Sequence, residues 1–165
     1  LFMHYSKEQW VWIELRVALG FILFWAFLDK TFGLGFATTP EKTWLAGGYP
    51  TEGFLKMAVK GPLASFYQSL SGSAVVDWLF MLGLLLIGAA LILGIGMRIA
   101  GYAGALLMLL MWSSLLLPAN NPILDEHIVY ALVFLGLGWS KAGNWWGLGG
   151  WWAETRLVKK YPWLQ

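Results

Sequence analysis

The chain alternates long apolar runs with short polar breaks. A helix signal begins at Ser6, because a Ser at the N-cap with a Gln three residues later forms a capping box. Apolar residues then dominate to about Phe32, where Gly33 supplies a typical helix stop. Two further windows, 78–97 and 99–124, contain no charged residue. A membrane-spanning helix needs about 20 apolar residues, so each segment is long enough to cross a bilayer.

This pattern predicts an all-α fold, an integral membrane four-helix bundle that forms a single domain over residues 1–165. Pro118 is expected to end the third helix. The fourth helix is short for a bilayer, so either its ends lie in the interface or the membrane thins locally. The turn between the second and third helices holds little beyond Arg98, which predicts antiparallel neighbours. The expected spans are about 7–32, 76–97, 99–117 and 125–140.

Composition supports a membrane protein and excludes several chemistries. Charged residues make up 12% of the chain, against roughly 25% in soluble domains. The absence of cysteine excludes disulfide exchange and thiolate-bound metals or iron–sulfur clusters. The two histidines, His4 and His127, should lie on opposite sides of the membrane, so neither a haem, a metal site nor another covalently bound cofactor is expected. A net charge of +2 without a basic cluster argues against nucleic acid as a partner.

The distribution of lysine and arginine predicts the orientation. With four spans, both termini share a side with the Arg98 turn, and loops rich in Lys and Arg stay in the cytoplasm. We therefore expect a multi-pass cell-membrane protein with cytoplasmic N- and C-termini. The cations on that side are Lys7, Arg98, Lys141, Arg156, Lys159 and Lys160.

Residues 33–74 are the only extended polar region, and they are rich in aromatic and turn residues. They predict a long outer loop that caps the bundle or re-enters the membrane, rather than a loose linker. Small residues spaced four apart, such as Ala90 with Gly94 and Gly101 with Ala105, let helices approach closely in lipid. We expect these close contacts to form between helices within the bundle. The alternative is that the small residues form a face for a second copy or a partner.

Ionisable residues from three helices should converge on the outer rim of the bundle. One interpretation is structural, because acids at a helix N-terminus complement its dipole. The functional interpretation places Lys30 and His127 as close neighbours in a small polar pocket beneath the long loop. The rim residues are Asp29, Lys30, Asp77, Asp125, Glu126 and His127.

Glu14 and Arg16 lie inside the first predicted span. Two residues apart on a helix, they point about 200° apart and are not natural partners. A charge within a membrane is costly and marks a functional candidate. Arg16 either extends to the lipid headgroups or turns inward to bind a carbonyl, a lipid phosphate or a quinone oxygen.

Several segments resemble the DoxX family of four-helix membrane proteins, over about residues 16–148. The most specific are LDKTFGLGF and NNPILDEHIVYAL, in this order along the chain. The family includes the membrane subunit of thiosulfate:quinone oxidoreductase, so the resemblance implies a quinone-linked role. The matching polar positions are Arg16, Asp29, Lys30, Arg98, Asp125, Glu126 and His127.

Two function classes stay open at this point. A thiosulfate site would need a strongly positive pocket, and the acidic rim argues against one. We therefore expect a membrane subunit associated with quinone-linked redox chemistry, with quinone as the cofactor and lipids, other membrane subunits or a second copy as partners. The alternative is a non-catalytic accessory subunit that packs on a larger complex and binds lipid. A cavity that reaches Arg16 or the rim favours the former, and a tightly filled bundle favours the latter.

Overall fold

The computed structural model describes residues 5–119 and 121–165, and this part of the chain contains helices but no strand. Three helices are long and apolar enough to cross a membrane: α1 (Lys7–Phe32), α4 (Ala74–Leu93) and α5 (Met97–Ser114). The apolar helix α6 (Glu126–Trp139) is shorter, at 14 residues. Three membrane-length apolar helices indicate a membrane protein.

Local sequence signals explain where most of the helices begin and end. Ser6 and Gln9 form the expected capping box at the start of α1, and Gly33 ends it in the left-handed conformation, with φ 65°. The helix α4 ends at Leu93, earlier than the expected residue 97, because Gly94 adopts φ 74°. Arg98 consequently lies in the first turn of α5 instead of in the connecting turn.

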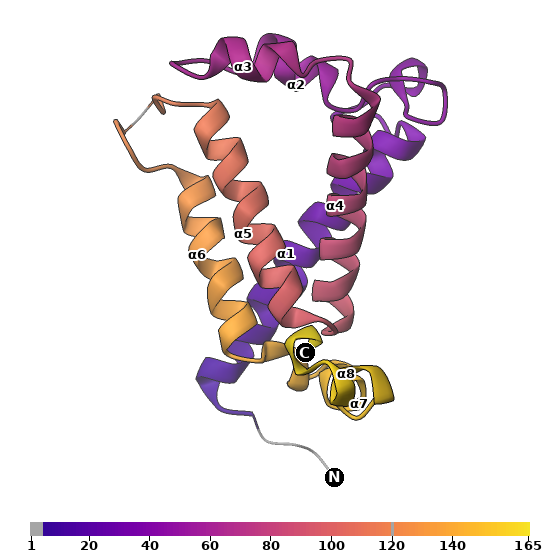
Figure 1. The fold of residues 1–165 in the computed structure, drawn as a ribbon, viewed down its shortest axis with the longest axis vertical. Coiled ribbons are helices and arrows are strands. Elements are labelled where there is room, and N and C mark those ends of the chain that lie inside the picture. Colours follow the sequence, from indigo (N-terminus) through magenta and orange to yellow (C-terminus); the bar gives the residue numbers. More distant parts are fainter. Residues whose placement is uncertain (1–4, 120) are drawn as a thin grey trace.

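The long helices are arranged as two pairs. Helix α1 packs along α4, and α5 packs along α6, while a smaller contact between α4 and α5 joins the pairs. The pairs diverge toward the end where residues 33–74 lie, which we call the loop end (Figure 1). They converge at the opposite end, which holds Arg98, the start of α1 and the C-terminus; we call it the Arg98 end (Figure 1).

Glycines lie where these helices approach one another. A Cβ at Gly88 would be 2.8 Å from the backbone nitrogen of Phe24 in α1. A Cβ at Gly101 would be 2.7 Å from the carbonyl oxygen of Phe134 in α6. These contacts are within the chain, in agreement with the expectation that small residues serve packing inside the molecule.

Short helices form where the sequence pattern revealed none. Residues 33–74 contain η1 (Pro40–Lys42), α2 (Glu52–Met57) and α3 (Ala64–Ser69). Both α2 and α3 lie across the loop end, between the ends of α4 and α5 (Figure 1). After α6, the chain folds against the Arg98 end (Figure 1). The elements there are η2 (Ala142–Asn144), α7 (Gly149–Ala153), α8 (Arg156–Lys160) and η3 (Pro162–Leu164).

Candidate functional site

The candidate polar residues occupy three separate places in the structure. Arg16 lies at the Arg98 end of α1. Asp29 and Lys30 lie at the loop end of α1, beside α4. Asp125, Glu126 and His127 lie at the start of α6. The residues His4 and Asn120, the latter being the first of the NNPILDEHIVYAL segment, lie outside the described residues.

Arg16 donates hydrogen bonds to the carbonyl groups at the C-terminus of α4. Its side chain is fully buried. One terminal nitrogen, Nη1, donates to the carbonyl oxygens of Leu91 at 2.6 Å and Ile92 at 3.1 Å. The other, Nη2, donates to the carbonyl oxygens of Trp146 at 2.8 Å and Trp145 at 3.4 Å. Arg16 therefore joins α1 to the end of α4 and to the segment that follows η2.

The backbone of α4 explains why an arginine is suited to this position. The last carbonyls of a helix have no partner within it. The Ala90 carbonyl accepts from the Gly94 and Ile95 N–H groups, and that of Leu93 accepts from the Leu148 N–H. Arg16 supplies the donors for the two carbonyls in between. The planar guanidinium, with several donors, can serve acceptors on both sides.

The surroundings of Arg16 are filled by protein. A Cβ at Gly94 would lie 2.8 Å from Nη1, and one at Gly147 would lie 3.3 Å from both terminal nitrogens. Of the two orientations expected for Arg16, the structure shows the inward one, with the side chain bound to backbone carbonyls. Glu14 is exposed on another face of α1, as the angle between the two positions requires.

The long loop is hydrogen-bonded to three side chains at the helix ends, Asp29, Lys30 and Asp77. The buried Asp29 carboxylate accepts from the backbone N–H groups of Phe36 and Ala37, at 3.2 and 2.9 Å. Lys30 Nζ donates to the Pro50 carbonyl at 3.3 Å. Asp77 is also buried, and its Oδ1 accepts from both the N–H and the hydroxyl of Thr51, at 2.9 and 2.7 Å. These contacts hold residues 36–51 in place.

Asp125 and His127 form a side-chain pair at the start of α6. Asp125 is the N-cap of the helix, and its Oδ1 accepts from the His127 backbone N–H at 3.0 Å. Its Oδ2 lies 2.9 Å from Nδ1 of His127. The His127 and Asp125 side chains are only 14% and 11% exposed. A carboxylate accepts hydrogen bonds, so it favours the tautomer with the proton on Nδ1 and leaves Nε2 as the reactive nitrogen.

This pair borders a cavity of about 230 Å³. Lys60 reaches it from the loop, and its backbone N–H donates to the Ser114 carbonyl at 3.0 Å. The cavity is smaller than the roughly 300–1,000 Å³ of typical ligand pockets, and so suits a small ring or headgroup. The residues lining it are Lys60, Leu115, Pro118, Ala119, Asn121, Leu124, Asp125, Glu126 and His127.

The structure does not form the pocket expected to be shared by Lys30 and His127. Helix α1 ends beside α4, while α6 begins on the other side of the loop end (Figure 1). No residue of α1 lines the His127 cavity. The reason is the pairing of the helices, since α1 contacts α6 near its own start, where Trp12 packs on Gly136. The expectation of close neighbours was therefore wrong, and Lys60 takes the place given to Lys30.

A second cavity, of about 450 Å³, lies at the Arg98 end. Its lining includes Lys141, which served only to predict the orientation, and Arg98, which is also one of the polar positions of the family resemblance. No local signal identified this cavity, because it depends on how residues 140–165 fold against the start of α5. Within the described residues, no three side chains of His, Cys, Asp or Glu are grouped so as to hold a metal ion.

We compared the chain with protein-family models, curated proteins and solved structures. No protein-family model, no curated protein and no solved structure matches the chain significantly.

Proposed function

We propose that this chain is a DoxX-type integral membrane subunit that binds a quinone headgroup at the His127 cavity and takes part in quinone-linked redox chemistry. The observation that carries the proposal is the Asp125–His127 pair on the wall of a small cavity at the loop end. A quinone ring needs hydrogen-bond donors for its carbonyl oxygens. Lys60 provides one there, and His127 provides one through Nε2 when its ring is protonated, because the Nδ1 proton is directed to Asp125. Electrons would come from a partner subunit or a soluble donor.

His127 is suited to a proton-transfer role. Reduction of a quinone to a quinol takes two electrons and two protons, and a protonated imidazole can donate a proton from a ring nitrogen. Asp125 holds the ring by Nδ1, so Nε2 is the nitrogen that can exchange a proton with the bound quinone oxygen. The cavity is too small for an isoprenoid tail, which would extend along neighbouring apolar residues. Leu117, Ile123 and Leu124 are all more than half exposed beside it.

Replacing His127 by glutamine should weaken the binding of a quinone analogue by at least tenfold, which is about 1.4 kcal/mol. Glutamine keeps a polar side chain but loses the ionisable ring. The measurement is a titration of the purified protein with the analogue. Lys30→Gln is the matched control, because Lys30 also lies at the loop end but does not line the cavity. Equal affinity of His127→Gln and wild type would contradict the proposal.

The same proposal includes four membrane crossings, with α6 as the fourth. At 1.5 Å per residue, 14 residues extend about 21 Å, less than the roughly 30 Å of a bilayer core. Local thinning of the membrane or burial of the flanking residues in the interface would accommodate this difference. Support comes from the chain path, since α1 begins at the same end at which the chain finishes (Figure 1).

We expect both termini to be cytoplasmic and position 60 to be outside. The chain has no cysteine, so Lys60→Cys and Lys160→Cys each introduce one unique thiol. A membrane-impermeant maleimide added to intact cells should label position 60, and position 160 only after the membrane is opened. Labelling of position 60 only from the cytoplasmic side would contradict this topology.

A structural accessory subunit is the second candidate, and specific contacts favour it. Arg16, Asp29 and Asp77 are buried, and each bonds to groups of the chain itself. These charges hold helices and the loop together. If a quinone analogue binds neither the wild type nor the variants, the accessory role becomes the better description.

A further inference from the structure

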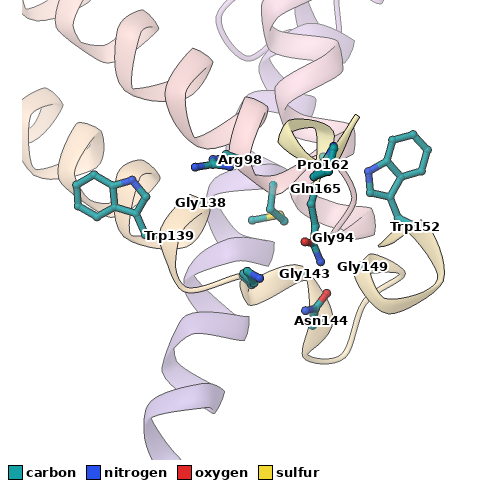
Figure 2. A pocket seen from close by; sticks show the side chains of 13 residues that line it. Gly94, Arg98, Gly138, Trp139, Gly143, Asn144, Gly149, Trp152, Pro162 and Gln165 are labelled. Carbon is teal, nitrogen blue, oxygen red and sulfur yellow. The ribbon is translucent and has the colours of Figure 1, made fainter. Parts of the chain in front are cut away.

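The cavity at the Arg98 end has the features of a lipid-headgroup site, and we infer that it binds the phosphate of an anionic phospholipid. It measures about 450 Å³ and is formed by the α4–α5 turn, the end of α6 and the folded-back C-terminal segment. Arg98, Asn144 and Gln165 lie between Trp139 and Trp152 (Figure 2). This site is separate from the His127 cavity and does not depend on the quinone proposal.

The positive charge of the cavity lining favours an anionic ligand. Arg98 and Lys141 line the cavity, and no Asp or Glu among the described residues does. Among the described residues, neither cation forms an ion pair. Glu154 does not line the cavity and is paired with Lys159 at 2.6 Å, and this hydrogen bond holds the pKa of the Glu154 carboxyl below its ordinary value. Glu154 therefore does not neutralise the cavity, and a phosphate oxygen would meet two available cations.

The surroundings favour a lipid over a soluble phosphate. Trp139 is 66% exposed beside the cavity, and tryptophan side chains gather at the level of lipid headgroups. From Arg98, an exposed stripe continues along α5 through Tyr102, Leu106 and Leu110. These positions are four residues apart, so they share one face of the helix. An acyl chain lying on this stripe would have its phosphate at Arg98, as for basic pockets at the ends of membrane helices.

The test compares lipids of equal chain length on the purified full chain. Native mass spectrometry would measure binding of phosphatidylglycerol and phosphatidylcholine, added together in equal amounts. We expect the wild type to prefer phosphatidylglycerol. In the double variant Arg98→Gln, Lys141→Asn, this preference should fall at least tenfold. Asparagine suits position 141 because Lys141 has φ 54°, a left-handed conformation that asparagine tolerates.

The matched control is Arg156→Gln, Lys160→Gln, which removes two exposed cations at the same end but outside the cavity lining. This variant should keep the preference. The single variant Lys141→Asn should lose part of it, and this provides a readout if the double variant does not fold. His127→Gln should bind phosphatidylglycerol like the wild type, which separates this test from that of the quinone proposal.

Three results would overturn the inference. The first is a wild type without preference for phosphatidylglycerol. The second is an equal loss in the control variant, which would show that total charge and not the cavity attracts the lipid. The third is displacement of phosphatidylglycerol by millimolar inorganic phosphate, which would identify the cavity as a site for a soluble anion.

Discussion

Replacing Arg16 by leucine should destabilise the protein by at least about 3 kcal/mol. The variant leaves the buried Leu91 carbonyl and the part-buried Ile92 and Trp146 carbonyls without their donor. Each buried polar group that loses its partner costs about 1–3 kcal/mol. Arg16→Lys should recover only part of the loss, because one ammonium cannot reach the acceptors on both sides.

The free energy of unfolding in detergent, measured with a chemical denaturant, checks this prediction. Arg156→Ala is the control, because Arg156 is an exposed arginine outside the long helices. It should change stability by no more than about 0.5 kcal/mol. An Arg16→Leu variant as stable as the wild type would show that other donors satisfy the end of α4.

The second large effect is expected at Gly101, where α5 meets the backbone of α6. A Cβ there would lie 2.7 Å from the Phe134 carbonyl oxygen and 3.1 Å from Cα of Gly138. Backbone atoms cannot rotate away as a flexible side chain can. Gly101→Leu should therefore force the two helices apart and cost about 3 kcal/mol, near the upper end for overpacking.

Gly83→Leu provides a control with the same chemical change. Gly83 also lies inside a long helix, but a Cβ at this position would meet no atom within 4 Å. Thermal unfolding of the two variants should lower the midpoint only for Gly101→Leu. Similar midpoints would mean that the contact between α5 and α6 adapts without cost.

The sequence allowed prediction of features that depend on neighbouring residues. The capping box at Ser6, the stop at Gly33 and the start of α6 at Asp125 are interactions over a few positions, and the structure has all three. The ends of α4 and α5 were predicted too late. Apolar residues continue past both ends, so hydropathy alone did not show where the helices stop.

The candidate site was harder to predict because it depends on which helices pair. Arg16 and Asp29 were both singled out as unusual polar residues, but their partners are backbone groups that no sequence pattern identifies. His127 pairs with Asp125 two residues away, but the cavity beside that pair depends on the fold. The pairing of α1 with α4 depends on the shapes of the helix surfaces, which the apolar pattern does not reveal. Because α6 pairs with α5 instead, Lys30 in α1 is separated from His127 in α6. Lys60 lies at the cavity because of the way the connection between α2 and α3 folds. The sequence of this connection contains no motif that indicates a binding site.

The contacts of Arg16 have a consequence for the order in which the chain is made. Its acceptors at Leu91 and Trp146 follow it by 75 and 130 residues. At about 5–20 residues per second, a ribosome needs roughly 4–15 s to reach the first and roughly 7–26 s to reach the second. During that time the emerging helix carries a cation without its acceptors, a costly state within lipid. The stable insertion of the first helix therefore depends on the synthesis of the last third of the protein.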